Sequence, residues 1–341
     1  MQEAQLGWNS DVINQNSSLF TAPEDVLNTI NSVSQILALV FVSLFAVLRL
    51  YTKTFVAPPW CAEDWMALIA WVLSLGYFAA GLLTGYFGGG FHIYELSKEQ
   101  LKGFKKGVYI ITLTYSSASY FTKLALLFII IRVFGVHKKT VIGTYTVVIF
   151  LTGYSIPILF LKGFICRPLA GFWDQTIITT CYNQQAIFIA DTSISAVTDM
   201  AVLILPVPVA VTLRMSWNKR LRVIAMLSSG GIATAVSLIR LVLVIKMQNS
   251  QDESVDFIRG NLLGTAEVST GLICACLPAI NLLLIRVVDR SHKSSHKFRD
   301  GSREFNPRFL RGSELRTQRG QITDLESTAE SPLQNISVDT P

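Results

Sequence analysis

Long apolar runs alternate with short polar segments over most of the chain, and this pattern predicts membrane-spanning helices. Seven runs of about 20 residues or more lie at 27–48, 65–87, 108–131, 141–165, 186–211, 221–246 and 262–285. A helix rises about 1.5 Å per residue, so each run can cross a hydrocarbon core roughly 30 Å thick. We therefore predict an all-α membrane protein, a seven-transmembrane helix bundle over 27–285, with an outer N-terminal segment 1–26 and a tail 286–341.

The lysines and arginines between these runs predict the orientation of the bundle. Cations follow the first, third, fifth and seventh runs, whereas residues 1–25 contain none. Cytosolic loops of membrane proteins carry the excess of cations, so we expect the N-terminus outside and the C-terminus in the cytosol. One loop on the predicted outer side, 97–107, disagrees with this rule because it is rich in lysine (Lys98, Lys102, Lys105 and Lys106).

The composition supports a membrane protein over a soluble one. The 341 residues are 51% hydrophobic and 15% charged, against a charged share of about 25% in soluble domains. The net charge of +6 comes from a basic strip that directly follows the last run, which favours contact with an anionic lipid surface and not with nucleic acid. The tail then becomes acidic and rich in serine and threonine, so we expect it to be disordered.

Ionisable residues inside the runs are costly in a bilayer and point to structural or functional sites. By helix rise, Lys123 and Asp199 lie about 22 Å and 20 Å below the outer ends of their runs, so they are predicted to form a buried ion pair. Nearer the outer end, Asp191, Arg240 and Glu267 each lie about 8 Å deep, and Arg240 is expected between the two acids.

Two interpretations of these charges stay open. They either fix the register of the helices or take part in function, and a ligand-contacting role is the hypothesis for Asp191, Arg240 and Glu267. At the cytosolic border, Arg49 ends one run and Asp64 begins the next, which predicts an interfacial ion pair.

Two cysteines share one predicted outer loop. Cys166 and Cys181 lie between the fourth and fifth runs, where an oxidising compartment favours a disulfide that would hold the loop as a lid over the bundle. The N-terminal segment holds a glycosylation acceptor at Asn16. The remaining cysteines are expected to be unreactive small residues (Cys61, Cys274 and Cys276).

Enzyme chemistry finds little support in this sequence. The four histidines, at 92, 137, 292 and 296, lie outside the apolar runs, so no metal site is expected inside the bundle. The seventh run contains no lysine, so a retinal Schiff base of the usual kind is not expected either. We therefore predict no catalytic residues and no cofactor.

Several short motifs follow one another along the chain. They are R-L-Y at 49–51 with an acidic pair at 63–64, G-G-G-F-H at 88–92, K-L-A-L-L at 123–127 with R-V-F at 132–134, C-R-P with a later W and C over 166–181, Asp199 with L-P-V-P at 205–208, S-L-I-R at 237–240, and Glu267 with C-L-P at 276–278. In this order they resemble the fungal family of seven-transmembrane, rhodopsin-domain integral membrane proteins. That family includes receptor-like members and members encoded in toxin gene clusters of the satratoxin type.

The resemblance implies a receptor-like, non-photoactive protein of the plasma membrane or an endomembrane. Such a protein would sense a small-molecule ligand at its outer face and signal to a cytosolic partner, with the lipid bilayer around it and no nucleic acid. Two alternatives remain: an accessory membrane protein of a secondary-metabolite cluster, and a transporter. An odd number of spans without a visible inverted repeat argues against the commonest transporter designs.

Overall fold

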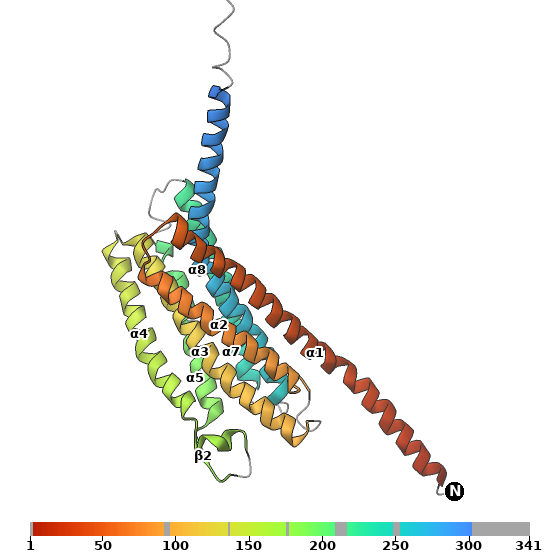
Figure 1. The fold of residues 1–341 in the computed structure, drawn as a ribbon. Helices are drawn as coiled ribbons and strands as arrows, with labels where there is room; N and C mark the ends of the chain where they lie inside the picture. Colours follow the sequence, from red (N-terminus) through yellow and green to blue (C-terminus); the bar gives the residue numbers. More distant parts are fainter. Residues whose placement is uncertain are drawn as a thin grey trace, which may run out of the picture. The chain divides into compact units, whose positions relative to one another are not determined.

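The structure is a computed structural model that describes residues 3–91, 96–135, 137–174, 177–208, 217–247 and 253–301. Side chains are described between 26 and 287, apart from 217–226 and a few flanking positions. Seven α-helices lie in these ranges: α1 (Glu3–Tyr51), α2 (Ala62–Tyr86), α3 (Lys98–Phe134), α4 (Lys138–Gly163), α5 (Gln184–Ile204), α7 (Trp217–Met247) and α8 (Glu253–Gly301). The predicted all-α fold is confirmed (Figure 1).

Six of the described helices are long and apolar enough to cross a membrane, namely those over Val26–Val56, Ala62–Tyr86, Lys98–Phe134, Lys138–Gly163, Gln184–Ile204 and Ser254–Val287. Helix α7 covers the remaining predicted run, 221–246. The boundaries that the apolar pattern placed at 26 and 285 fall inside α1 and α8, because both helices continue into polar sequence. The tail from 302 onward lies outside the described residues, and the side of the membrane that each end faces stays a prediction.

The lysine-rich segment 97–107 is helical, which corrects its assignment to a loop. Ser97 caps α3: its hydroxyl accepts from the Gln100 amide at 3.3 Å, and its own amide donates to the Gln100 side chain at 3.0 Å. This reciprocal capping starts the helix ten residues before the apolar run. The lysines of the segment therefore belong to the first turns of α3 and not to a loop before it.

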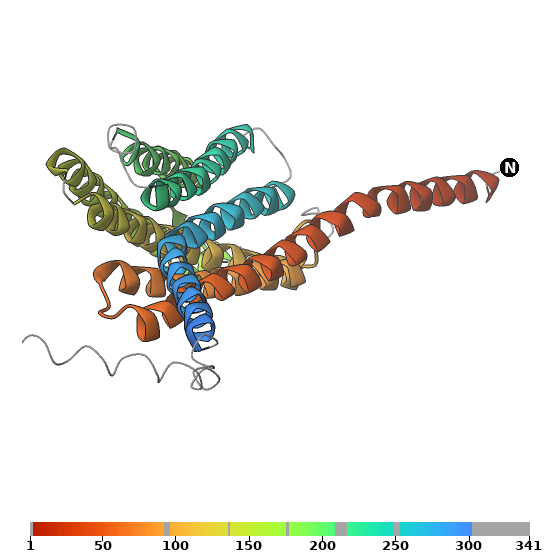
Figure 2. The ribbon, with the colours of Figure 1, turned by 90° about the horizontal axis from the view of Figure 1, so that it is seen from above.

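Small residues set how closely the helices approach. Helices α2 and α3 pack along much of their lengths, and a Cβ atom added to Gly107 of α3 would collide with Thr84 of α2. Helices α5 and α7 also lie side by side (Figure 2). Small-residue contacts of this kind replace the hydrophobic driving force that is absent between helices in lipid.

A buried polar seam joins α1, α2 and α8. The Gln35 amide donates to the hydroxyl of Thr265 at 2.9 Å, and the Tyr77 hydroxyl donates to Asn261 at 2.8 Å. Side-chain hydrogen bonds between helices stabilise a bundle whose surroundings offer no water. Outward-facing side chains are apolar instead, for example Val72, Ile149 and Ile239, which are 57%, 71% and 55% exposed. Such surfaces suit contact with acyl chains.

Candidate functional site

The deepest charges of the bundle form an ion pair between α3 and α5. The Lys123 ammonium lies 2.9 Å from the Asp199 carboxylate, and the Lys123 side chain is only 6% exposed. The ammonium also donates to the hydroxyl of Thr198 at 3.0 Å and to the Ser195 carbonyl oxygen at 2.9 Å. The cation is thus fully supplied with acceptors, which is the condition under which a buried charge is tolerated.

A second pair joins α7 and α8 and connects to the first. Arg240 lies 3.1 Å from Glu267, and both side chains are buried. Ser195 links the pairs, because its hydroxyl accepts from Lys123 at 2.8 Å and donates to Glu267 at 3.0 Å. We call these five residues the central network: Lys123, Ser195, Asp199, Arg240 and Glu267. It ties four helices together and balances two cations against two acids.

Asp191 has a partner that the sequence pattern did not identify. Its carboxylate pairs with Lys162 of α4 at 2.5 Å, and the Lys162 side chain is 2% exposed. Tyr154 donates to the same carboxylate at 3.4 Å. The prediction of Arg240 between Asp191 and Glu267 is therefore corrected: Arg240 pairs with Glu267, while Asp191 pairs with Lys162. Each acid is neutralised by its own cation, which satisfies both in a medium of low dielectric constant.

At the opposite end of the bundle, five charged residues form what we call the border cluster. Arg49 of α1 lies 2.6 Å from Asp64 of α2, the two residues expected to meet there. Lys53 lies 2.8 Å from the same carboxylate, and Arg132 of α3 pairs with Glu63. The cluster therefore joins the ends of three helices.

Cys61 and the two acids of this cluster have ligand atoms within 4.8 Å of one another. A metal ion there would compete with three cations that already hold the carboxylates, so this geometry does not fit a metal centre.

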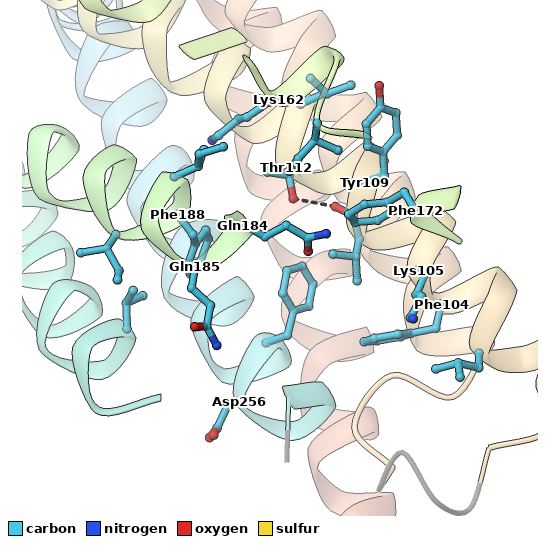
Figure 3. Close-up of a pocket in the computed structure, with 18 residues that line it drawn as sticks. Phe104, Lys105, Tyr109, Thr112, Lys162, Phe172, Gln184, Gln185, Phe188 and Asp256 are labelled. Atoms are coloured by element: carbon cyan, nitrogen blue, oxygen red, sulfur yellow. Dashed lines mark hydrogen bonds between the residues drawn. The ribbon is translucent and has the colours of Figure 1, made fainter. Parts of the chain in front are cut away.

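A cavity of about 300 Å³ lies at the end of the bundle near the first turns of α3 and α5. We call it the lid-end cavity, and its walls come from α3, α4, α5, α7, α8 and the segment after α4 (Figure 3). Four phenylalanines line it: Phe104, Phe172, Phe188 and Phe257. Its polar lining includes Lys105, Thr112, Lys162, Gln184 and Gln185. Small-molecule sites are typically apolar cavities of about 300 Å³ or more with a few polar groups, and this cavity matches that description.

The described residues between α4 and α5, 164–174 and 177–183, form a lid loop on this cavity. The predicted disulfide joins Cys166 to Cys181 within a small antiparallel pair, β1 (Cys166–Arg167) and β2 (Thr180–Cys181). Phe172, in the 3-10 turn Leu169–Phe172, contributes to the cavity wall and packs 5.7 Å from the Tyr109 ring of α3.

Two lysines of segment 97–107, Lys102 and Lys106, bind this lid loop. Lys102 pairs with Asp174 at 2.7 Å, and Lys106 lies 5.6 Å above the Trp173 ring. The segment that disagreed with the charge rule therefore holds the lid loop to α3.

The three residues predicted to contact a ligand lie behind the lid-end cavity and do not form its wall. Of Asp191, Arg240 and Glu267, none lines that cavity directly, and Arg240 lines a small pocket next to it. The cavity is instead reached by Lys162, the partner of Asp191. Asn16 lies outside the residues whose side chains are described, so its glycosylation stays a prediction.

Comparisons with known proteins agree with this architecture. The family model of the fungal rhodopsin domain matches residues 48–286, which is most of the chain. The chain belongs to the fungal rhodopsin domain family. It is thus an all-α integral membrane protein, and the motif resemblance is confirmed.

The relatives of this chain are named as a membrane protein, a receptor and a biosynthesis cluster protein. The chain is 25% identical over 195 residues to a SAT4 family membrane protein of Emericella nidulans, covering 57% of this chain and 49% of the relative. It is 25% identical to Receptor GIN3 of Arthrobotrys oligospora, covering 72% and 60%. It is also 25% identical to Fugralins biosynthesis cluster protein 2 of Gibberella zeae, covering 73% and 64%. The matches thus span from about half to less than two thirds of the length of these relatives.

Proposed function

We propose that this protein is a receptor-like, non-catalytic membrane protein that binds a small molecule in the lid-end cavity. The observation that carries the proposal is the cavity itself: about 300 Å³, mostly apolar, covered by a disulfide-linked loop and bordered by a buried ion pair. The relative named as a receptor supports the same class of function. Binding would act on the bundle through the charges next to the cavity.

Lys162 gives the cavity its connection to the interior. It lines the cavity and pairs with Asp191, and its ammonium also contacts the hydroxyl of Ser116 on α3. Seven residues further along that helix lies Lys123 of the central network. We propose that Asp191, Arg240 and Glu267 act behind the ligand, so that ligand binding changes the packing of α3, α4 and α5 around them.

The border cluster would carry the response to the cytosolic side. Arg132 is the last charged residue of α3, and its side chain is 55% exposed even though it pairs with Glu63. An exposed, ion-paired arginine at a helix end can change partners at low energetic cost. A signalling partner would therefore meet a surface whose charges depend on the position of α3.

An accessory role in a secondary-metabolite pathway is the second candidate. It is favoured by relatives named as cluster proteins, for fugralins and for wortmanamides. In that role the cavity would hold a pathway compound without signalling.

The experiment that separates these functions compares variants at Arg240 in a deletion strain. Arg240→Lys keeps a cation beside Glu267 but removes the guanidinium, so it should abolish the transcriptional response to an added culture extract while the tagged protein stays in the membrane at its usual amount. Loss of the protein from the membrane would show a structural role for Arg240. A changed metabolite profile in the deletion strain, without any response to the extract, would favour the accessory role.

A further inference from the structure

A small pocket adjoins the lid-end cavity on its inner side. It shares four lining residues with that cavity: Thr112, Lys162, Phe188 and Phe257. Its volume is about 20 Å³, enough for one water molecule or one ligand oxygen atom. We call it the inner pocket; it extends the cavity toward α7 and α8, where Arg240 and Gly260 line it.

Arg240, which lines the inner pocket, has an unused hydrogen-bond donor. The residue is 3% exposed, and its Nη1 donates to Glu267 and to the Tyr115 hydroxyl. Its Nε has no hydrogen-bond partner among the described residues. The guanidinium carbon lies 4.1 Å from the centre of the Tyr115 ring and 5.9 Å from that of Phe188, so the group lies close to two aromatic rings. A buried N–H without an acceptor is unfavourable, and an acceptor placed in the inner pocket would satisfy it.

The charges around the pocket select the kind of acceptor. Arg240 is already neutralised by Glu267, and Lys162 by Asp191. A carboxylate in the inner pocket would add an unbalanced charge to a buried site, whereas a carbonyl or hydroxyl oxygen would not. Lys105, which could bind an acid, lies seven residues from Thr112 along α3, about 10 Å from the inner pocket by helix rise.

We infer that the lid-end cavity takes a mostly apolar molecule whose uncharged carbonyl or hydroxyl oxygen enters the inner pocket and accepts a hydrogen bond from Arg240 Nε. This inference rests on the proposed function, because it names the ligand class of the same cavity. It also explains how an uncharged ligand reaches the central network: the oxygen binds the arginine that pairs with Glu267.

The test uses the full-length protein in lipid nanodiscs and three fluorescent naphthalene probes. The first probe is 6-propionyl-2-dimethylaminonaphthalene, a neutral ketone whose emission depends on hydrogen bonding to its carbonyl. The second replaces the propionyl group by a propyl group, and the third by a carboxylate. Binding is measured as saturable fluorescence above that of empty nanodiscs. We expect the ketone to bind at least about tenfold more tightly than either analogue, because one charge-assisted hydrogen bond contributes a factor of about ten to the affinity.

Two variants locate the oxygen. Arg240→Lys keeps the positive charge beside Glu267 but removes Nε, so it should weaken ketone binding about tenfold and leave propyl-probe binding unchanged. Gly260→Ala tests the inner pocket without touching an ion pair, because a Cβ atom at this buried glycine meets nothing within 4 Å. The added methyl group should therefore fill the pocket and weaken ketone binding, while the helix keeps its stability.

Gly153→Ala on α4 is the matched control. Its added Cβ also meets nothing within 4 Å, but the residue is exposed and lines neither cavity, so ketone binding should not change. Equal saturable binding of the ketone and the propyl analogue would overturn the inference and leave the cavity proposal standing. Tighter binding of the carboxylate would overturn it as well. Absence of saturable binding by all three probes would count against the proposed function itself.

Discussion

Removing the cation of the deepest ion pair should destabilise the bundle strongly. In Lys123→Met the side chain keeps its length but loses its charge, while Asp199 and Glu267 stay buried. The wild-type network balances two cations and two acids, so the variant leaves one uncompensated negative charge. Breaking a buried pair in this way costs about 3–5 kcal/mol.

The structure indicates why this cost should fall in that range. Asp199 keeps one donor, the hydroxyl of Ser237, but it loses the ammonium at 2.9 Å. Glu267 keeps Arg240 at 3.1 Å and the hydroxyl of Ser195. The loss therefore falls mainly on Asp199. For a domain of this size, about 3–5 kcal/mol corresponds to a decrease in the melting temperature of roughly 6–20 °C.

The assay is thermal unfolding of the purified protein in detergent, followed by tryptophan fluorescence. Adding Asp199→Asn to Lys123→Met removes the stranded charge and should recover most of the lost stability. Lys138→Met, at the exposed first residue of α4, is the control for the chemical change and should shift the melting temperature by less than about 2 °C. If the double variant loses the sum of both single losses, the two residues are not coupled and the reasoning is wrong.

Three further predictions concern the lid loop, the border cluster and helix packing. Cys166→Ser opens a link between residues 15 positions apart and should destabilise the lid loop by about 3 kcal/mol, which limited proteolysis of the loop would detect. Arg132→Gln removes the half-exposed partner of Glu63, which keeps Lys53 at 4.0 Å, so it should cost about 1 kcal/mol while altering coupling to the cytosolic partner proposed above; a large loss of melting temperature would contradict this role. Gly107→Ala should destabilise the bundle by about 1–3 kcal/mol through its collision with α2, and unchanged thermal unfolding would show that the neighbouring helix can yield.

Among the sequence signals, depth along a helix gave the most accurate prediction of the site. Two estimates of helix rise placed Lys123 and Asp199 at nearly the same depth, and the structure brings them to 2.9 Å. Depth alone does not give the face of a helix, however, so it could not assign partners within the second layer. Lys162 lies near the end of its apolar run, where a lysine usually extends to the membrane surface, and nothing in the sequence indicates that it turns inward to Asp191.

Other features differ in how far the sequence could reveal them. The extension of α3 was predictable, because Ser97 and Gln100 have the spacing of a capping box, but the four lysines of the segment made it look like a polar loop.

The lid-end cavity was not predictable. Its volume depends on how five helices and the lid loop pack, and side chains that line a void have the same residue types as those that fill a core.

Among the described elements, α3 takes part in every feature that the function would need. It supplies Lys105 and Thr112 to the cavity, Ser116 beside Lys162, Lys123 to the central network and Arg132 to the border cluster. These residues span about 40 Å of one helix, which is close to the full thickness of a membrane. A packed helix with ion pairs at several depths moves as a unit, since each pair resists a local bend. A ligand that changes the position of α3 at Lys105 should therefore change the pairing of Arg132. The ion pairs at intermediate depths would transmit the movement, because they keep α3 from bending between the two ends.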